Sequence, residues 1–215
     1  MTDILELDTP AVLIDLDRVE ANLARVQAYA DSHAIKLRPH IKTHKLPRFA
    51  KRAMELGAVG ITVQKLGEAE VFADAGITEI FLPYNIIGPA KLARLKALHA
   101  RIHITVTADS AETVEGLSRT FANSPTPLTV LVECDTGMGR CGVQTPAAAL
   151  ALAEKIANSP GLAFGGLMTY PAAGQVEANA AWLAAAKLAL TAAGLPPAAV
   201  SNGGTPDIWR AHEVT

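Results

Sequence analysis

The chain lacks several features that would assign it to a class of protein at once. Its 215 residues include two cysteines, Cys134 and Cys141, which are too few for a disulfide framework. This scarcity favours reduced thiols and a cytoplasmic location. The formal net charge is -2 and the isoelectric point is near 6.3, so no broad basic surface is expected. Nucleic acid and acidic membranes are therefore not expected as partners.

Long apolar runs are also missing. No run approaches about 18 uninterrupted apolar residues, so no membrane span is predicted. The opening segment MTDILELD has no basic stretch followed by an apolar run, so no secretory signal is predicted either. No Gly/Ser linker or charge block divides the chain, and its apolar content of 50% is enough for a single core. One domain over residues 1–215 is predicted.

What the chain does contain is a regular alternation of short apolar, β-branched runs with segments of helical periodicity. Such strand–helix repeats imply a parallel sheet with right-handed crossovers. A closed (β/α)8 barrel needs eight units, and this α/β chain offers seven, so an incomplete barrel is expected. A seven-stranded doubly wound sheet is the alternative. An additional strand is predicted over residues 11–16, and the seven others are predicted at 37–41, 59–63, 80–82, 102–106, 128–134, 162–168 and from 200.

The richest polar cluster is RPHIKTHK, from Arg38 to Lys45. It lies where a strand is expected to end, which is the catalytic face of a barrel. A lysine partly buried there among other cations can lose its proton, and a neutral amine is what a Schiff base with an aldehyde cofactor requires. A solvated basic loop is the alternative. His40 and His44 are candidates for proton transfer, or for structural hydrogen bonding.

A second cluster, ECDTGMGRCG, follows the buried run at 128–134. Its three glycines allow the backbone to approach a ligand closely. Arg140 can donate hydrogen bonds to a phenolate or carboxylate oxygen. A plain turn with a surface arginine is the alternative.

A third cluster, SNGGTP, stands between an apolar run and an expected helix start at residues 201–206. Exposed backbone amides, a small hydroxyl side chain and a helix amino end together form a phosphate cradle. An ordinary strand–helix loop is the alternative reading of the same residues.

The string PHIKTHK, following TPAVLIDLD, resembles the D-threonine aldolase/D-serine dehydratase family, which has barrels of the alanine racemase N-terminal kind. The resemblance implies pyridoxal 5'-phosphate as cofactor, with a Schiff base on Lys42 and not on Lys45. It places Arg140 beside the cofactor's ring oxygen and Gln64 and Tyr170 along the ring, where a satisfied loop residue and simple packing are the alternatives. The implied cofactor-binding positions are Lys42, Gln64, Arg140, Tyr170, Ser201, Asn202, Gly203, Gly204 and Thr205.

The activity implied by the resemblance is a lyase that cleaves D-configured β-hydroxy amino acids by retro-aldol chemistry. A D-serine dehydratase-like lyase, an amino-acid racemase and a non-catalytic carrier of pyridoxal phosphate are the alternatives. A small D-amino acid is the expected partner, and a homodimer is common in the family.

Family members are longer, since they continue into an eighth barrel strand and a C-terminal β-domain. Residues 1–16 are expected to contribute a strand to that domain, so the chain is interpreted as a fragment whose own activity is left open. Many members carry a metal-binding histidine followed two residues later by aspartate or cysteine. None of the six histidines here has that spacing, so no metal ligand is assigned and a divalent metal is expected only in a longer form.

Overall fold

The computed structural model describes residues 3–214 and contains one curved sheet of six parallel strands. The strands stand side by side in sequence order, and every neighbouring pair is parallel. A helix connects each strand to the next, as such connections require. The six strands are β1 (Ile61–Thr62), β2 (Glu79–Leu82), β3 (His103–Ala108), β4 (Leu128–Cys134), β5 (Leu162–Thr169) and β6 (Ala199–Ser201).

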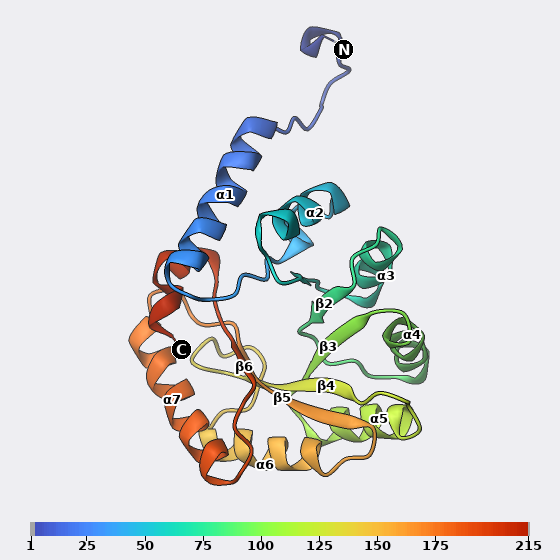
Figure 1. Ribbon diagram of the computed structural model, residues 1–215, viewed down its shortest axis with the longest axis vertical. Helices are drawn as coiled ribbons and strands as arrows, with labels where there is room; N and C mark the ends of the chain where they lie inside the picture. The colour runs from blue at the N-terminus through green and yellow to red at the C-terminus, as the bar shows by residue number, and fades with distance from the viewer. Residues whose placement is uncertain (1–2, 215) are drawn as a thin grey trace.

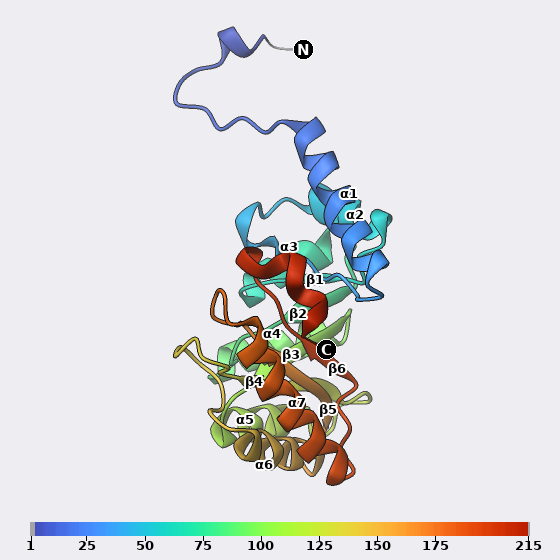
Figure 2. The ribbon, with the colours of Figure 1, turned by 90° about the vertical axis from the view of Figure 1, so that its left-hand side faces the viewer.

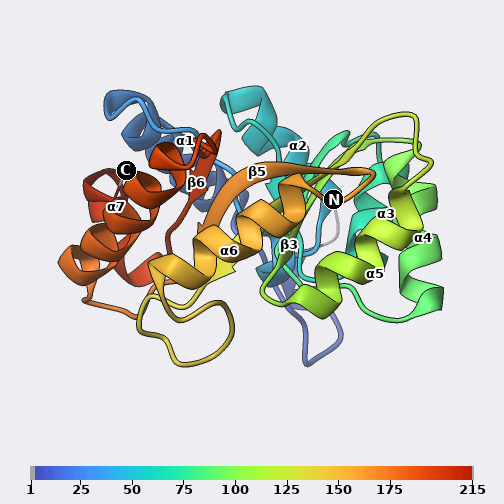
Figure 3. The ribbon, with the colours of Figure 1, turned by 90° about the horizontal axis from the view of Figure 1, so that it is seen from below.

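The helices between the strands cover the outer side of this sheet (Figure 1, Figure 3). Several begin at a side-chain cap, with Asp15, Ser110 and Thr145 each accepting a hydrogen bond from a first-turn amide. None of the described helices is long and apolar enough to cross a membrane. The α-helices are α1 (Leu16–Ser32), α2 (Pro47–Leu56), α3 (Leu66–Asp74), α4 (Pro89–His99), α5 (Ala111–Phe121), α6 (Pro146–Ala157) and α7 (Val176–Ala192), and the 3-10 helices are η1 (Ile4–Glu6), η2 (Ile41–Thr43) and η3 (Thr205–Glu213).

Alternate residues of each strand face opposite sides of the sheet. In β4, Val130 and Val132 belong to the large core between the sheet and its helices, whereas Leu131 belongs to a small inner cluster with Phe81 and Met168. Both faces of the strand are covered, which explains its nearly continuous apolar sequence. The helices lie outside and a side-chain layer lies inside, as in a barrel wall, so the incomplete barrel is confirmed and the doubly wound alternative is wrong.

The run at residues 37–41 is not the full strand that the sequence predicts. It lies parallel to β1, where the amides of Val59 and Thr62 donate to the carbonyls of Leu37 and Pro39 at 2.9 and 2.8 Å. Among the described residues, the pairing of this segment with β1 is limited to one isolated parallel bridge, between His40 and Thr62. Pro39 has no amide hydrogen to donate, so a continuous ladder cannot form through it. Six strands and one bridged edge segment therefore replace the seven predicted strands.

Residues 11–15 are not a strand either, and α1 begins at Leu16. Val12, Leu13 and Ile14 are 94%, 58% and 47% exposed in an arm that projects from the body (Figure 2). No described strand lies beside this arm to supply backbone partners. The strand prediction is therefore wrong for this structure, and its expected union with a β-domain stays a prediction.

Candidate active site

The three predicted clusters meet at the ring of Tyr170, which directly follows β5. The Nζ atom of Lys42 lies 5.8 Å from the ring centroid, and Cζ of Arg140 lies 5.1 Å from it. A Cβ atom added to Gly204 would stand 3.5 Å from Cε2 of the same ring. Segments separated by more than a hundred residues thus converge on one aromatic side chain at the carboxyl ends of the strands.

The two lysines of the first cluster have different surroundings. Lys45 pairs with the buried carboxylate of Glu68, at 2.9 Å between Nζ and Oε1. Lys42 has no ion-pair partner among residues 3–214 and is exposed, which differs from the predicted partial burial. The cause of this exposure is its position in η2, which follows the edge segment of the sheet. Of the two amines, that of Lys42 is the one free to react.

His40 lies beside Lys42 and is partly buried. Its Nδ1 accepts a hydrogen bond from the backbone amide of Lys42 at 3.2 Å, so the proton of the neutral ring is assigned to Nε2. Burial, and then the charge of Lys42, lower the pKa of His40 to about 4, although Glu68 and a hydrogen bond with Gln64 oppose them. This contact brings Gln64 to the same cluster, and its predicted place along a cofactor ring stays a prediction.

His44 points toward α2 instead. Its Nδ1 accepts from the amide of Leu46 at 3.0 Å, and its ring stands edge-on to Phe49 with centroids 5.6 Å apart. Partial burial lowers the pKa of this imidazole. These contacts fix the start of α2, and a part for His44 in proton transfer stays a prediction.

Arg140 is presented by a rigid glycine turn. One carboxylate oxygen of Asp135 accepts from the amides of Gly137 and Gly139, each at 3.0 Å. Both glycines have positive φ, of 121° and 66°, which few other residues adopt. Burial would raise the pKa of Asp135, but these hydrogen bonds and one from Gln144 outweigh it and lower the pKa. The turn is therefore locked by an ionised carboxylate.

A buried acid behind Arg140 was missed in the sequence. Glu133 is 4% exposed and accepts from Sγ of Cys141 at 3.0 Å and from the hydroxyl of Thr107 at 3.3 Å. Burial raises the pKa of Glu133, and Cys141 also accepts a hydrogen bond from Arg140. Strand alternation in β4 was the available signal, because it places Glu133 on the inner face with Leu131.

The third cluster has the form of an anion cradle. Ser201 ends β6, and Gly203 adopts a φ of 129° with open space where a Cβ would stand. Gly204 precedes η3 without any side-chain cap. Pro206 has no amide hydrogen and the amide of Asp207 donates to the carbonyl of Gly204 at 3.3 Å, so of the first helix amides only that of Thr205 is free to bind an anion, together with the amides of the Gly203–Gly204 turn. The Asn202 side chain is engaged elsewhere: it accepts from Nδ2 of Asn179 at 3.2 Å and donates to the carbonyl of Val214 at 3.4 Å.

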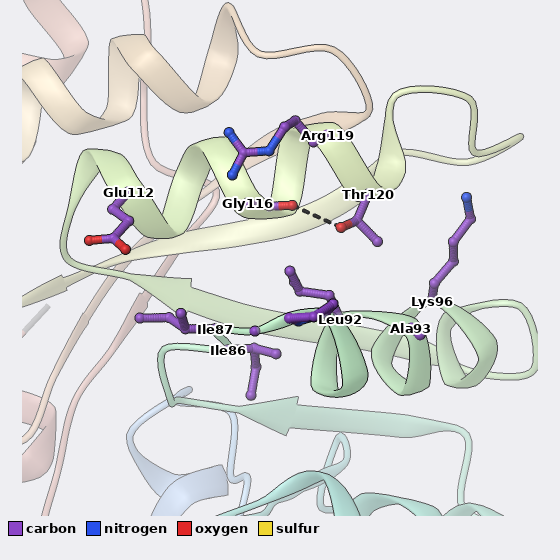
Figure 4. Close-up of a pocket in the computed structure, with 11 residues that line it drawn as sticks. Ile86, Ile87, Leu92, Ala93, Lys96, Glu112, Gly116, Arg119 and Thr120 are labelled. Atoms are coloured by element: carbon purple, nitrogen blue, oxygen red, sulfur yellow. Dashed lines mark hydrogen bonds between the residues drawn. The ribbon is translucent and has the colours of Figure 1, made fainter.

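A larger hollow than the one beside the cradle lies elsewhere on the described surface. It measures about 610 Å³ and is formed between α4 and α5, with Ile87, Leu92, Lys96 and Gly116 among its lining residues (Figure 4). None of the predicted site residues lines it. This outer groove is therefore separate from the residues that converge on Tyr170.

The donor set at the rim fits a phosphorylated aldehyde such as pyridoxal phosphate. It combines an unpaired amine, a guanidinium and the free backbone amides of the turn that ends at Thr205, and the Gly203–Gly204 turn leaves space that side chains would fill. A metal site is not assembled in the same way. Residues 3–214 contain no group of three or more His, Cys, Asp or Glu side chains placed to hold a metal ion.

Comparison with known proteins identifies the family. Residues 14–215 match the alanine racemase N-terminal domain, and the chain belongs to this family of pyridoxal-phosphate-dependent enzymes. It is 44% identical over 164 residues to a D-threonine aldolase of Arthrobacter sp, covering 76% of this chain and 43% of that protein. It is 36% identical over 216 residues to D-threo-3-hydroxyaspartate dehydratase of Delftia sp., covering 94% and 57%.

A solved structure agrees with these matches. The crystal structure of D-threonine aldolase from Filomicrobium marinum superposes with a TM-score of 0.90 at 35% identity, over 98% of this chain and 61% of that one. The resemblance predicted from the sequence motifs is confirmed. The chain spans about half the length of the curated relatives it matches.

Proposed function

We propose that this chain forms the cofactor-binding part of a pyridoxal-phosphate-dependent lyase acting on D-configured β-hydroxy amino acids. The observation that carries the proposal is the convergence of Lys42, Arg140 and Gly204 on Tyr170. An amine, a cation and an anion cradle around one flat ring are the groups needed to hold an aromatic aldehyde phosphate. Relatives with aldolase and dehydratase names support the substrate class.

Each group of this site has a distinct task in the proposal. The Lys42 amine would hold the aldehyde carbon covalently, and the amides from Gly203 to Thr205 would hold the phosphate. Arg140 would donate to the oxygen on the cofactor ring, and its cation–π contact with Tyr170 would position the guanidinium for this. When bound, pyridoxal phosphate supplies an electron sink for the bond that breaks at the substrate α-carbon.

His40 contributes through its charge state. With a pKa of about 4, its imidazole is neutral near pH 7 and adds no positive charge beside Lys42. Its Nδ1 is already used to accept from the Lys42 amide, so the ring orients the reactive turn. The divalent metal and the homodimer expected of a longer form remain predictions.

Product analysis separates the candidate activities. The chain, and a version of it extended through a β-domain, would be incubated with pyridoxal phosphate and D-threonine or D-serine. Retro-aldol cleavage of D-threonine predicts glycine and acetaldehyde, whereas dehydration of D-serine predicts pyruvate and ammonia. A racemase would instead place solvent deuterium at the α-carbon without cleavage.

The matched controls for that assay are Lys42→Ala and Lys45→Ala. The first removes the reactive amine and the second only an ion pair with Glu68. We expect glycine and acetaldehyde from the extended protein and from its Lys45→Ala variant, and none from Lys42→Ala. A pyridoxal-phosphate-loaded extended protein that releases no product from either substrate would contradict the lyase and favour a carrier.

A further inference from the structure

Asn179 is a buried polar residue on an otherwise apolar helix face. The other described residues of α7 that are buried are Val176, Leu183, Ala186 and Leu190, all apolar. Asn179 is 1% exposed, and its Oδ1 has no hydrogen-bond partner among residues 3–214. An amide placed in such surroundings carries a desolvation penalty, so the one hydrogen bond that it makes calls for an explanation.

That hydrogen bond leads to the anion cradle. Nδ2 of Asn179 donates to Oδ1 of Asn202 at 3.2 Å, and Nδ2 of Asn202 donates to the carbonyl of Val214 at 3.4 Å. The carbonyl can only accept, so Asn202 must turn its NH2 group toward Val214 and its oxygen toward Asn179. The direction of the whole chain of hydrogen bonds is thereby fixed.

Asn202 is adjacent to the turn whose amides are free. Gly203 has a φ of 129°, and Gly204 precedes η3 without a side-chain cap. Asn179 lines a small hollow together with Asn202, Gly203 and Gly204. α7 and the end of β6 are therefore tied together at the residue that sets the entry to the turn.

We infer that Asn179 is a positioning residue for phosphate binding: through Asn202 it holds the Gly203–Gly204 turn in the conformation that directs backbone amides at the anion. The inference rests on the proposed function, since that function supplies the phosphate. Asn179 itself does not touch the ligand. Its contribution is expected for ligands that carry a phosphate and not for the ring or the aldehyde.

The test compares pyridoxal phosphate with pyridoxal, which has the same ring and aldehyde but no phosphate. Equilibrium dissociation constants for both would be measured by absorbance with the full 215-residue chain. Asn179→Leu removes the donor at similar size. The matched control is Leu183→Ala, which perturbs the same buried helix face one turn after Asn179, at a residue that is 1% exposed, and leaves the Asn179 donor in place.

We expect Asn179→Leu to weaken pyridoxal phosphate about tenfold, since one orienting hydrogen bond is lost, and to leave pyridoxal within about twofold. Leu183→Ala should change both ligands alike. Inorganic phosphate should compete with pyridoxal phosphate less well in the Asn179→Leu variant than in the wild-type chain. If the Leu variant does not fold, Asn179→Ala lacks the donor, adds no charge or bulk and is expected to show the same selective loss.

Equal loss for both ligands in Asn179→Leu, or no loss for either, would overturn the inference while leaving cofactor binding at Lys42 intact. Failure of the proposed function itself would be seen in the wild-type chain and not in the variants. In that case the wild-type chain would bind neither ligand at Lys42, and the positioning role would fall with it.

Discussion

At the scale of single residues, the site combines groups with opposite electrostatic needs within a few side chains. The charged groups of Lys42 and Arg140 both lie near the ring of Tyr170. The imidazole of His40 is neutral near pH 7, and the carboxyl group of Glu133 is buried behind Arg140. Burial of Glu133 raises its pKa, and its hydrogen bond from Cys141 favours the protonated thiol. The acid therefore suppresses the reactivity of the cysteine that lies next to Arg140.

This coupling predicts the labelling rate of Cys141. Burial is the main cause that raises the pKa of the Cys141 thiol, and Glu133 adds to it. In Glu133→Gln the acid is lost, so we expect the thiolate fraction, and alkylation at pH 8, to rise about fivefold. Cys134 would not interfere, because burial raises its pKa to about 12. An unchanged or slower rate, with Cys141→Ser as the blank, would contradict the coupling.

The motifs led to the residues that converge on Tyr170 because each motif combines unusual residue types at a strand end. Lys42, Arg140 and Gly204 were predicted from their positions after apolar runs and from the family resemblance. Asn179 was missed, although it is the single polar residue at a helical spacing of apolar ones. Its role depends on a side-chain contact with Asn202, which no local pattern encodes.

At the scale of elements, the strand–helix order was predictable, and the edges of the sheet were not. Central strands such as β4 are apolar on both faces, and this pattern follows from burial alone. The segment at 37–41 is apolar at both ends but includes Pro39, and residues 11–15 are largely apolar but have no partner strand among the described residues. Pairing is a property of two segments together, so composition cannot decide it at an edge.

The cradle directly follows β6, so its position depends on the pairing of β5 with β6. Gly166 is the residue of this pairing that has no room for a side chain. Gly166 has a φ of 132°, and a Cβ there would lie 1.9 Å from the carbonyl oxygen of Ala199. We expect Gly166→Ala to lower the free energy of unfolding by about 3 kcal/mol or more, because overpacking and backbone strain add. Urea unfolding of the purified variant measures this.

Gly174→Ala is the matched control for that variant. Gly174 also has a positive φ, of 72°, but nothing lies within 4 Å of the added Cβ. Only the conformational cost of about 1 kcal/mol is expected there. Equal losses for Gly166→Ala and Gly174→Ala would show that the strand contact does not limit stability.

At the scale of the whole molecule, stability should fall in acid. The pKa of His40 is about 4 in the folded chain and ordinarily 6.5, so below pH 6.5 the unfolded chain binds a proton that the folded chain does not. The resulting loss grows as the pH falls from 6.5 to 4 and amounts to at most about 3 kcal/mol. Asp135, whose folded pKa is lowered, loses its stabilising contribution in the same direction as it becomes protonated.

The measurement for this prediction is urea unfolding at pH 7.5 and pH 5. His40→Gln removes the titrating imidazole, so the difference in unfolding free energy between the two pH values should shrink in that variant. An equally steep loss in His40→Gln would assign the acid sensitivity to other groups.

The central claim is that Lys42 is the point of attachment for pyridoxal phosphate, and borohydride trapping tests it most directly. The chain would be incubated with pyridoxal phosphate, reduced and digested, and the modified peptide would be located by mass spectrometry. We expect a pyridoxyl group on Lys42 that persists in Lys45→Ala and disappears in Lys42→Ala. Label scattered over surface lysines, or no label in the chain and in its extended form, would contradict it.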